Sequence, residues 1–431
     1  MTGVLDRTLD ALLERPPLLT ADALPPQTLR RGERLVADTI AVALAGARLP
    51  QYEALLAART EPAGDRAPNV IAPGRRWAPA PLAAFLNGTA AVALELDESL
   101  VGGGHPGAHV VPAALAEAQR LGRSGEQLVA AALSGYEVAG RLYRAQRMRH
   151  PLHPHGLLGG IGAAVAVAQL RGADAAAAAR AAATLPLVPS WEACFEGAGA
   201  RNAWTGAAAL LAVLACDLAE AGLHGASAAP GELLAAIAEP ADLAALAAPL
   251  DPAAPLVTQS QTRVHAAAGP LHTAIEAARE LRPHVAGRDV EAVVVETVER
   301  NRKFDRLPHN CLAARFSLPH AVAAALTADA LTPAAFGLQP DALALAERVE
   351  VVVAPDLEAR WPARTAARVT LHVDGASHVA SCDVPRGHPE RPLDEAAFAQ
   401  RLAALAGAEG AAALDALASR PDVADLLGGL R

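Results

Sequence analysis

One short stretch of the sequence, residues 94–112 (LELDESLVGGGHPGAHVVP), gathers several residue types that carry out proton chemistry. Carboxylates and imidazoles are among the side chains most often used as general acids and bases. Three glycines stand between them and prolines follow, so we expect regular structure to break here. The stretch contains, in chain order, Glu95, Asp97, Glu98, Ser99, His105 and His109.

A second histidine-bearing segment, HPHG at 153–156, precedes a run rich in glycine and alanine. If that run is a helix, its first N–H groups can hold an anion. His153 and His155 are therefore candidates for binding or catalysis, although a histidine is more often a structural group. The prolines between these histidines and the absence of an HExxH helix lead us to expect no metal site.

Two arginines are candidate cations for a carboxylate. Arg201 lies in GARNAWTG (199–206) and Arg263 lies in QTRVHAAAGPLH (261–272). A guanidinium binds a carboxylate through two parallel hydrogen bonds, but it practically cannot exchange a proton. The chain has a single lysine, Lys303, so an arginine where a relative has lysine can reflect composition alone.

Composition excludes several classes of protein. The 431 residues are 52 % hydrophobic and carry a net charge of −9, which argues against a general nucleic-acid binder. The longest apolar runs, around 156–170 and 202–216, fall short of the roughly 18 residues of a membrane span and are expected to be buried core helices. The four cysteines form no CxxC pair, which predicts neither a zinc site nor a disulfide framework. We therefore expect a reduced, cytoplasmic protein that binds neither nucleic acid nor membrane.

Hydrophobic periodicity divides the chain into two kinds of structure. The first part is helical almost throughout, including a helix that Ser124 begins with Gln127 as its capping-box partner. After about residue 260, β-branched runs predict strands, with a hairpin turn at Asp374-Gly375. The sequence therefore predicts a mainly α protein with two domains. These are a large all-α helical domain, at 1–260 and 394–431, and a smaller α+β domain, at 261–393.

Several segments, in order and over nearly the whole chain, resemble the MmgE/PrpD family. They include LVADTIAVALAG (35–46), AAFLNGTAAVALELDES (83–99), HPHGLLGGIGAAVAVAQLRG (153–172), GARNAWTGAAALLAVLACDLAEAGLHG (199–225) and ARFSLPHAVAAAL (314–326). Members of this family act on small di- or tricarboxylic acids by proton transfer next to a carboxylate, with loss of water, loss of CO2 or inversion. The resemblance implies a lid formed by the α+β domain, no metal or organic cofactor, and a homodimer.

The resemblance also assigns roles to individual residues. It implies that the helix ends before the first stretch so that the acids and His105 face one cleft. The catalytic residues that it implies are His105 and His153, as base or acid, and Glu95 or Asp97, as the carboxylate partner. The substrate-binding residues that it implies are Ser99, His155, Arg201, Arg263 and His272. We expect Glu98 to lie at a solvated helix end and His109 to be structural.

Three positions depart from the family pattern. A family histidine falls on Val92, an aspartate is replaced by Glu95, and a lysine is replaced by Arg201. We therefore expect a cofactor-independent lyase or isomerase that acts on a small carboxylic acid different from the standard ones. A dehydratase or decarboxylase comes first and an epimerase second. The alternative is a relative that has lost catalysis and acts as a ligand-binding or interaction protein.

Overall fold

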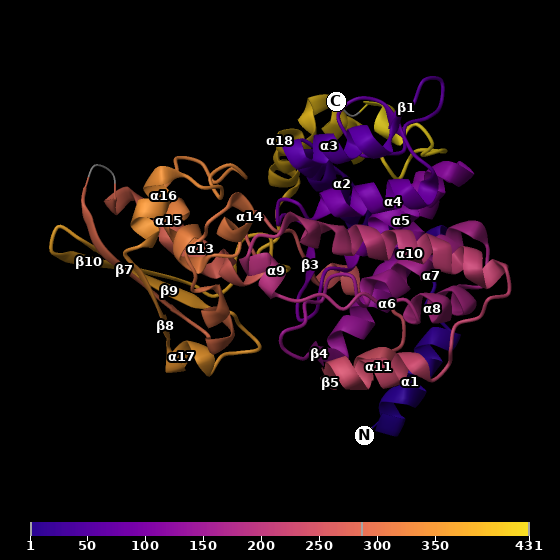
Figure 1. Cartoon of the computed structure of the whole chain (residues 1–431), viewed down its shortest axis with the longest axis horizontal. Coiled ribbons are helices and arrows are strands. Elements are labelled where there is room, and N and C mark those ends of the chain that lie inside the picture. Colours follow the sequence, from indigo (N-terminus) through magenta and orange to yellow (C-terminus); the bar gives the residue numbers. More distant parts are fainter. Residues whose placement is uncertain (1, 286–287, 430–431) are drawn as a thin grey trace.

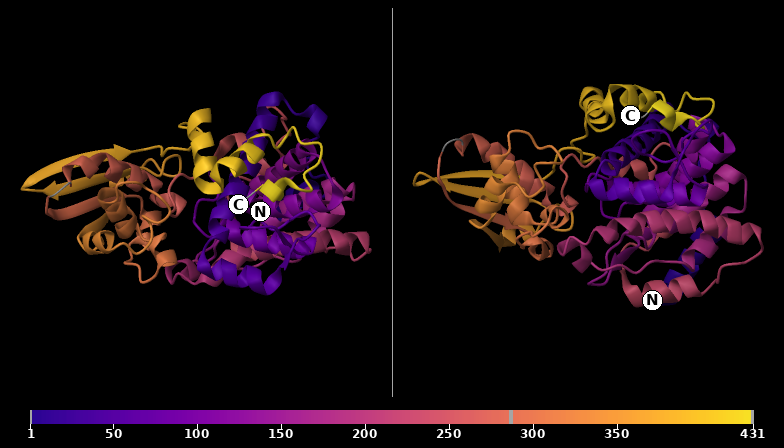
Figure 2. Two further views of the ribbon diagram at one scale, coloured as in Figure 1. Left: turned by 90° about the horizontal axis from the view of Figure 1, so that it is seen from above. Right: turned by 45° about the horizontal axis from the view of Figure 1, so that its top comes forward.

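The computed structural model describes residues 2–285 and 288–429, which form two lobes (Figure 1). The larger lobe is built of packed helices, and both ends of the chain lie on it (Figure 2). The smaller lobe projects from one side and contains a four-stranded sheet. The prediction of a mainly helical protein is confirmed, with small sheets in addition.

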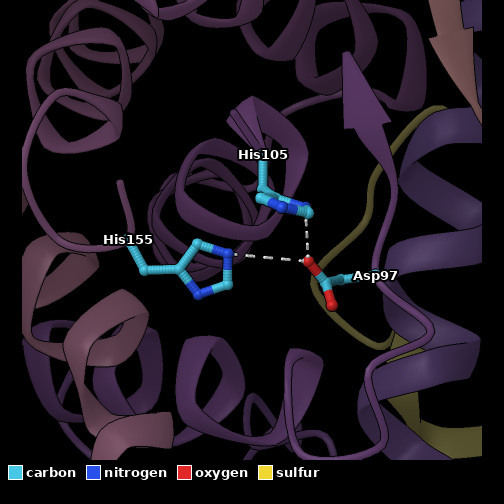
Figure 3. A group of neighbouring side chains, drawn as sticks. All are labelled: Asp97, His105 and His155. Atoms are coloured by element: carbon cyan, nitrogen blue, oxygen red, sulfur yellow. Dashed lines mark ion pairs between the residues drawn. The ribbon is translucent and has the colours of Figure 1, made fainter. Parts of the chain in front are cut away.

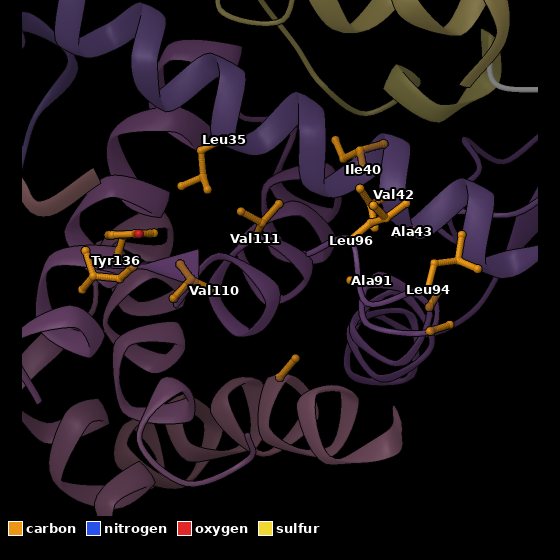
Figure 4. Close-up of a cluster of buried hydrophobic side chains, with 14 of the residues drawn as sticks. Leu35, Ile40, Val42, Ala43, Ala91, Leu94, Leu96, Val110, Val111 and Tyr136 are labelled. Atoms are coloured by element: carbon orange, nitrogen blue, oxygen red, sulfur yellow. The ribbon is translucent and has the colours of Figure 1, made fainter. Parts of the chain in front are cut away.

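The helices of the larger lobe surround a continuous hydrophobic core. Figure 4 shows part of it, where Ile40, Val111 and Leu96 belong to one buried cluster. The helices are α1 (Thr2–Glu14), α2 (Pro26–Ala47), α3 (Pro50–Arg59), α4 (Ala80–Ala91), α5 (Pro106–Leu121), α6 (Gly125–Arg144), α7 (Gly159–Arg171), α8 (Ala175–Ala183), α9 (Glu192–Phe195), α10 (Ala203–Glu220), α11 (Ala229–Ile237), α12 (Ala244–Ala247) and α18 (Glu395–Asp415).

Small residues let the central helices of this lobe approach closely. Gly88 of α4 faces Gly206 of α10, where a Cβ on Gly206 would overlap Thr89 Oγ1 and the Phe85 carbonyl oxygen. Protein interiors are close-packed, so even one added methyl group must displace its neighbours. The α4–α10 contact thereby fixes the end of α4, from which the acids of residues 95–98 continue.

Local capping sets where two of these helices begin. The Ser124 hydroxyl accepts from Gln127 N and the Gln127 side chain accepts from Ser124 N, which confirms the predicted capping box. Asp394 caps α18, which packs against α2. An ion pair of 2.6 Å from Arg401 Nε to Asp38 Oδ1 fastens α18 to α2, so the C-terminal helix is part of the larger lobe.

The smaller lobe contains a sheet with the strand order β10-β9-β7-β8. β7 is parallel to β8 and antiparallel to β9, and helices α13 and α15 pack on the sheet. The β9–β10 hairpin turns at Asp374-Gly375, with φ of 51° and 72°, as predicted. The elements are α13 (His272–Leu281), β7 (Val290–Thr297), α14 (Cys311–Ala314), α15 (Leu318–Thr327), α16 (Pro340–Ala346), β8 (Val349–Val353), α17 (Pro355–Glu358), β9 (Ala367–Val373) and β10 (Ala376–Cys382).

The larger lobe also contains short strand pairs, so its description as all-α is wrong in this detail. One pair joins Ser99–Leu100 (β3) to Ser260–Gln261 (β6) and satisfies the backbone of the stretch that leaves α4. Two-residue strands carry too little periodicity to be predicted from a sequence. The other pairs are β1 (Glu61–Pro62) with β2 (Arg76–Trp77) and β4 (Gln146–Met148) with β5 (Ala238–Pro240).

The two segments that connect the lobes run side by side. Thr262 N donates to the Gly387 carbonyl at 3.0 Å, and Gly387 has a φ of 88° with no room for a side chain beside Thr262. Arg315 of the smaller lobe donates to the carbonyls of Leu94 and Ala266 at 3.1 and 2.9 Å. The smaller lobe is therefore tied directly to the backbone that leads into the acidic stretch.

One helical segment of the described chain, Gly199–Glu220, is long and apolar enough to cross a membrane by length and composition. Half of its most apolar window is buried inside the fold. It includes α10, which packs against α4, α5, α7 and α8. The core helix of a soluble protein has the same properties, as the sequence led us to expect of this run.

The α4–α10 packing generates a stability prediction. We expect Gly206→Ala to lower the free energy of unfolding by about 3 kcal/mol, because the new methyl group meets Thr89 and Phe85. The matched control is Gly199→Ala, whose Cβ would meet nothing within 4 Å. We expect it to change the stability by less than about 1 kcal/mol. Urea unfolding of both variants measures the difference, and equal stabilities would contradict the close approach.

Candidate active site

The acidic stretch follows a sharp change of backbone direction after α4. The helix ends at Ala91, and Glu95 takes a φ of 54°, which side chains other than glycine rarely adopt. Such a conformation costs about 1–3 kcal/mol and persists where other contacts enforce it. The glycine turn then uses φ of 82° at Gly102 and 64° at Gly104 to bring the chain back to His105, which stands immediately before α5.

Glu95 is held by two arginines. Its carboxylate accepts from Arg201 Nη1 at 2.5 Å and from Arg263 Nη1 at 3.3 Å. All three side chains are almost fully buried. Removing one partner of a buried ion pair costs about 3–5 kcal/mol, so these contacts are strong enough to hold Glu95 in its unfavourable backbone conformation.

Asp97 connects this ion cluster to an imidazole. Arg263 donates to one carboxylate oxygen of Asp97, and its other oxygen lies 2.9 Å from His105 Nδ1. Burial alone would raise the pKa of Asp97, but the Arg263 guanidinium and His105 outweigh it and lower the pKa to about 2. Asp97 is therefore a fixed negative charge beside His105.

The surroundings of His105 decide which of its nitrogens carries the proton. Nδ1 lies 2.7 Å from the Glu98 carbonyl oxygen as well as 2.9 Å from Asp97. Both neighbours can only accept, because the carbonyl has no proton and Asp97 is ionised. Nδ1 must then hold a hydrogen, and in the neutral ring Nε2 keeps the free lone pair. This is the arrangement of a general base that a carboxylate orients.

His155 lies on the other side of Asp97. Its Nδ1 is 3.2 Å from Arg201 Nη2, which can only donate, so the ring hydrogen belongs on Nε2. Nε2 is 4.0 Å from Asp97 Oδ2, the same oxygen that His105 Nδ1 approaches to 2.9 Å, so Asp97 lies between the two imidazoles (Figure 3). Burial lowers the pKa of His155 well below its usual value, and nearby His105 adds to this.

His153 is buried behind an aromatic side chain. Its Nδ1 accepts from His155 N at 3.1 Å, and its ring centroid lies 4.2 Å from that of Trp191. Burial lowers the pKa of His153 well below its usual value, and the Arg201 charge adds to this. His153 does not line the cleft in the part of the chain that the structure describes, whereas His105 and Trp191 do.

Asp97, His105 and His155 place three possible metal-ligand atoms within 4.8 Å of one another. The surrounding charges do not suit a divalent cation, because Arg263 contacts Asp97 and Arg201 contacts His155. His105 Nδ1 would also have to give up its hydrogen to bind the ion. The group fits the handling of protons beside an anionic ligand better than it fits a metal.

The expectation that Glu98 is a solvated helix end is wrong. Its side chain is 4 % exposed, and its carboxyl group contacts the Tyr136 hydroxyl and accepts from Gly107 N at 2.9 Å. Burial raises the pKa of Glu98 to about 7, although both hydrogen bonds oppose this. Tyr136 lies 38 residues from Glu98 in the sequence, so no local sequence pattern predicts this contact.

The remaining predicted residues occupy three different places. His109 Nδ1 lies 2.8 Å from the His105 carbonyl and Nε2 accepts from Gly156 N at 2.9 Å, which agrees with a structural role. Ser99 lines the cleft. His272 lies in the smaller lobe, where its contacts among the described residues are with the Ala267 carbonyl and the His265 ring. Asp97, His105 and His155 form the acid–histidine cluster, and no hydrogen bond or ion pair among the described residues joins His272 to it. The Arg263 charge nevertheless adds to burial and His265 in lowering the pKa of His272.

A cleft of about 510 Å³ lies between the lobes and reaches the acidic stretch. His105 and the glycine turn line it from the larger lobe, and segments around residues 361–365 and 383–388 line it from the smaller lobe. The side chain of His105 is 18 % exposed, whereas those of Asp97 and His155 are 2 % and 1 % exposed. His105 is therefore the member of the cluster that a molecule in the cleft can touch.

Sequence reasoning missed several residues of this site. Tyr136 pairs with Glu98, Arg315 holds the Leu94 carbonyl, and Trp191 covers His153. Lys303 also lines the cleft, and its ammonium lies over the Trp191 ring. A signal for Lys303 was present in the sequence, because it is the only lysine of the chain.

Comparison with known families identifies the chain. Models of the MmgE/PrpD N-terminal domain and of the MmgE/PrpD C-terminal domain match residues 18–232 and 265–416, which make up most of the sequence. The chain belongs to the MmgE/PrpD family. Membership of this family indicates a function of the dehydratase or lyase type. A comparison with curated proteins found no match.

The buried histidines generate a prediction about pH and stability. The pKa of His109 is lowered by burial to about 4, and those of His153 and His155 also lie well below 6.5. The unfolded chain therefore binds more protons, so stability falls as the pH drops below about 6.5. At pH 5 the His109 ring alone costs about 2 kcal/mol, and His153 and His155 add to the loss in the same direction. Urea unfolding at pH 7 and pH 5 measures the loss.

Glu98 provides the internal control, because its raised pKa changes the stability with pH in the direction opposite to that of the buried histidines. Between about pH 4.5 and pH 7 the folded chain holds a proton on Glu98 that the unfolded chain releases, so this group favours folding at the acidic end. We expect Glu98→Gln to enlarge the loss from pH 7 to pH 5 by about 2 kcal/mol. A variant with a smaller loss than the wild type would contradict the assigned direction.

Proposed function

We propose that this chain is a cofactor-independent lyase or isomerase that moves a proton at a carbon next to a carboxylate of a small carboxylic acid. The outcome is dehydration, decarboxylation or epimerisation, with a substrate that differs from the standard ones of the family. The observation that carries the proposal is the Asp97–His105 pair: Nδ1 faces two acceptors, so Nε2 carries the lone pair of the neutral ring, and His105 lines the cleft.

His105 is the base in this proposal. Nε2 takes the proton from the carbon, and the resulting imidazolium is stabilised by the ionised Asp97 next to Nδ1. The electron pair left on the carbon is delocalised into the adjacent carboxylate. Positively charged residues near the site stabilise the negative charge that develops there. In a dehydration, His105 then gives this proton to the departing hydroxyl, which leaves as water. In an epimerisation, His105 gives the proton up to solvent while water in the cleft protonates the opposite face of the carbon. In a decarboxylation no proton is taken first: the electron pair comes from the C–CO2 bond that breaks, and the imidazolium form of His105 supplies the proton that the carbon receives.

Arg201 and Arg263 act indirectly in this proposal, through their contacts with the buried acids next to His105. Both guanidinium groups are engaged by Glu95 and Asp97, so their first role is to hold those two acids in place and to keep Asp97 ionised. Direct binding of a substrate carboxylate by either arginine stays a prediction. His155 and His153, which are buried and neutral, provide a non-ionic wall around Asp97.

A catalytically inactive binding protein is the weaker candidate. Loss of the family histidine at Val92 would favour it if Val92 made the cleft apolar, but Val92 is fully buried and is not among the described residues that line the cleft. A homodimer, the absence of nucleic-acid and membrane partners, and a cytoplasmic location stay predictions from the sequence.

The proposal is tested by NMR in D2O with a panel of small acids: methylcitrate, citrate, cis-aconitate, iminodisuccinate and β-hydroxy acids. We expect deuterium at the carbon next to a carboxylate, or appearance of an alkene or of CO2, for at least one acid. His105→Ala and Asp97→Asn should each lower the rate about 100-fold or more, because they remove the base and its charged partner.

The matched control is His378→Ala, because His378 lies on β10 of the smaller lobe and stacks on His284. It should retain the wild-type rate. Binding of one of the acids without exchange or turnover would support the inactive relative instead. Full activity in His105→Ala would remove the proposed base.

A further inference from the structure

The cleft is lined mainly by positive charge, although the chain as a whole is acidic. Among the described residues that line it, Asp383 is the one carboxylate, and Arg360 pairs with it. The lining cations are Arg144, Arg147, Arg300, Lys303 and Arg364. A cleft with one sign of charge attracts and retains ligands of the opposite sign.

Three of these cations have aromatic partners in place of anionic ones. Arg147 and Arg300 lie 5.3 and 6.0 Å from the Trp361 ring centroid, and Lys303 Nζ lies 3.5 Å from that of Trp191. Within residues 2–285 and 288–429, none of the three has an ion pair or a side-chain hydrogen bond. Arg144 and Arg364, in contrast, bond to Gln259 and Glu390.

Lys303 is the cation of this group that lies next to the acid–histidine cluster. It belongs to the short 3-10 helix Glu299–Phe304 of the smaller lobe, whereas Trp191 belongs to the larger lobe. The same Trp191 ring packs on His153 at 4.2 Å, and His153 packs on His155 at 4.6 Å. Lys303 therefore reaches from one lobe onto the wall of the proton-transfer site in the other.

We propose that Lys303 is a substrate-binding residue that holds a carboxylate of the substrate remote from the carbon at which His105 acts. Lys303 thereby selects acids that carry at least two carboxylates. This inference rests on the proposed function, because it assigns one end of the substrate to His105. A half-buried ammonium with no anionic partner is an unfavourable arrangement, which a substrate carboxylate relieves.

The chemistry of the amine agrees with this geometry. Burial, together with the Arg300 charge, lowers the pKa of Lys303 to about 8, while Cys194 acts in the opposite direction. At about pH 8 the amine is therefore divided between its charged and uncharged forms. A carboxylate bound beside it favours the charged form and raises the pKa again.

Labelling of the purified wild-type chain tests the inference without any need for turnover. Trinitrobenzenesulfonate reacts only with uncharged amines, and Lys303 is the only lysine, so the modified peptide is identified unambiguously by mass spectrometry. At pH 8 a rise of about one pKa unit reduces the reactive fraction about fivefold. We therefore expect saturating citrate to slow labelling of Lys303 about fivefold or more, and acetate and chloride at equal ionic strength to have little effect.

The N-terminal amine of the same molecules is the internal control, and its labelling should not respond to citrate. The proposal is overturned if citrate, cis-aconitate and succinate all leave Lys303 labelling unchanged. It is overturned also if chloride slows labelling as much as citrate does, because general screening would then explain the effect. Slower labelling in the presence of the polycarboxylates alone supports the proposal.

Three variants measure the contribution of Lys303 to substrate use. A charge-assisted hydrogen bond lost in Lys303→Met should raise KM about 10- to 100-fold, with kcat changed less than about threefold. Lys303→Arg keeps the charge and should recover part of the loss. The matched control is Arg302→Met, since Arg302 is 62 % exposed on the same short helix and pairs with Glu299, and its KM should equal the wild-type value.

The two proposals fail in different ways. If no acid undergoes exchange but citrate still protects Lys303, the anion subsite stands and the proton-transfer function fails. If an acid turns over and Lys303→Met has the wild-type KM, the function stands and the inference about Lys303 fails. Thermal unfolding of Lys303→Met identifies a folding defect, in which case the labelling of the wild-type chain decides.

Discussion

Two buried carboxylates and two buried guanidinium groups form the interaction on which the rest of the structure depends. Glu95 and Asp97 are paired with Arg201 and Arg263, and all four side chains are removed from water. Buried charges are tolerated only when paired and hydrogen-bonded. The left-handed backbone at Glu95 and the position of His105 both depend on this pairing.

The cluster also joins parts of the fold that are far apart in sequence. Arg201 comes from the turn before α10, Arg263 from the segment that leads to the smaller lobe, and the acids from the stretch after α4. Close helix packing at Gly88 and Gly206 holds the first and third of these together. Arg315 of the smaller lobe donates to the Leu94 carbonyl, next to Glu95. The position of this lobe and the geometry of the acids are therefore coupled.

The buried residues of the site and the residues that line the cleft have different roles. The buried groups next to His105 fix its tautomer and keep Asp97 ionised, while His105 is the one of Asp97, His105 and His155 that lines the cleft in the described part of the chain. The cleft itself supplies cations with no anionic partner of their own within the described chain, which suits an acid as ligand. Proton chemistry and anion binding are thus carried out by neighbouring but distinct sets of residues.

Local features of the fold were predictable from the sequence, and long-range partnerships were not. The Ser124 cap and the Asp374-Gly375 turn depend on neighbours in the chain, and both are present. The stretch after α4 was expected to break, and it does so. The burial of Glu98 was missed because its partner, Tyr136, is 38 residues away. The family resemblance was needed to associate His105 with Asp97.

Contacts between lobes were the least predictable part of the site. A histidine such as His272 matches a family position in sequence, but its ring packs within the smaller lobe beside His265. Lys303 has no motif around it, and only the folded chain places it over Trp191. Both cases depend on contacts between residues that are not neighbours in a local sequence pattern, and the Lys303–Trp191 contact also joins the two lobes.

The most direct test of the central claim is a crystal structure of the full chain with citrate, a stable tricarboxylate. The account predicts citrate in the cleft between the lobes, with a carbon next to a carboxylate about 3.5 Å from His105 Nε2 and the Asp97–His105 contact intact. Citrate bound elsewhere, or bound in the cleft with His105 Nε2 turned away from it, would contradict the assignment of His105 as the base.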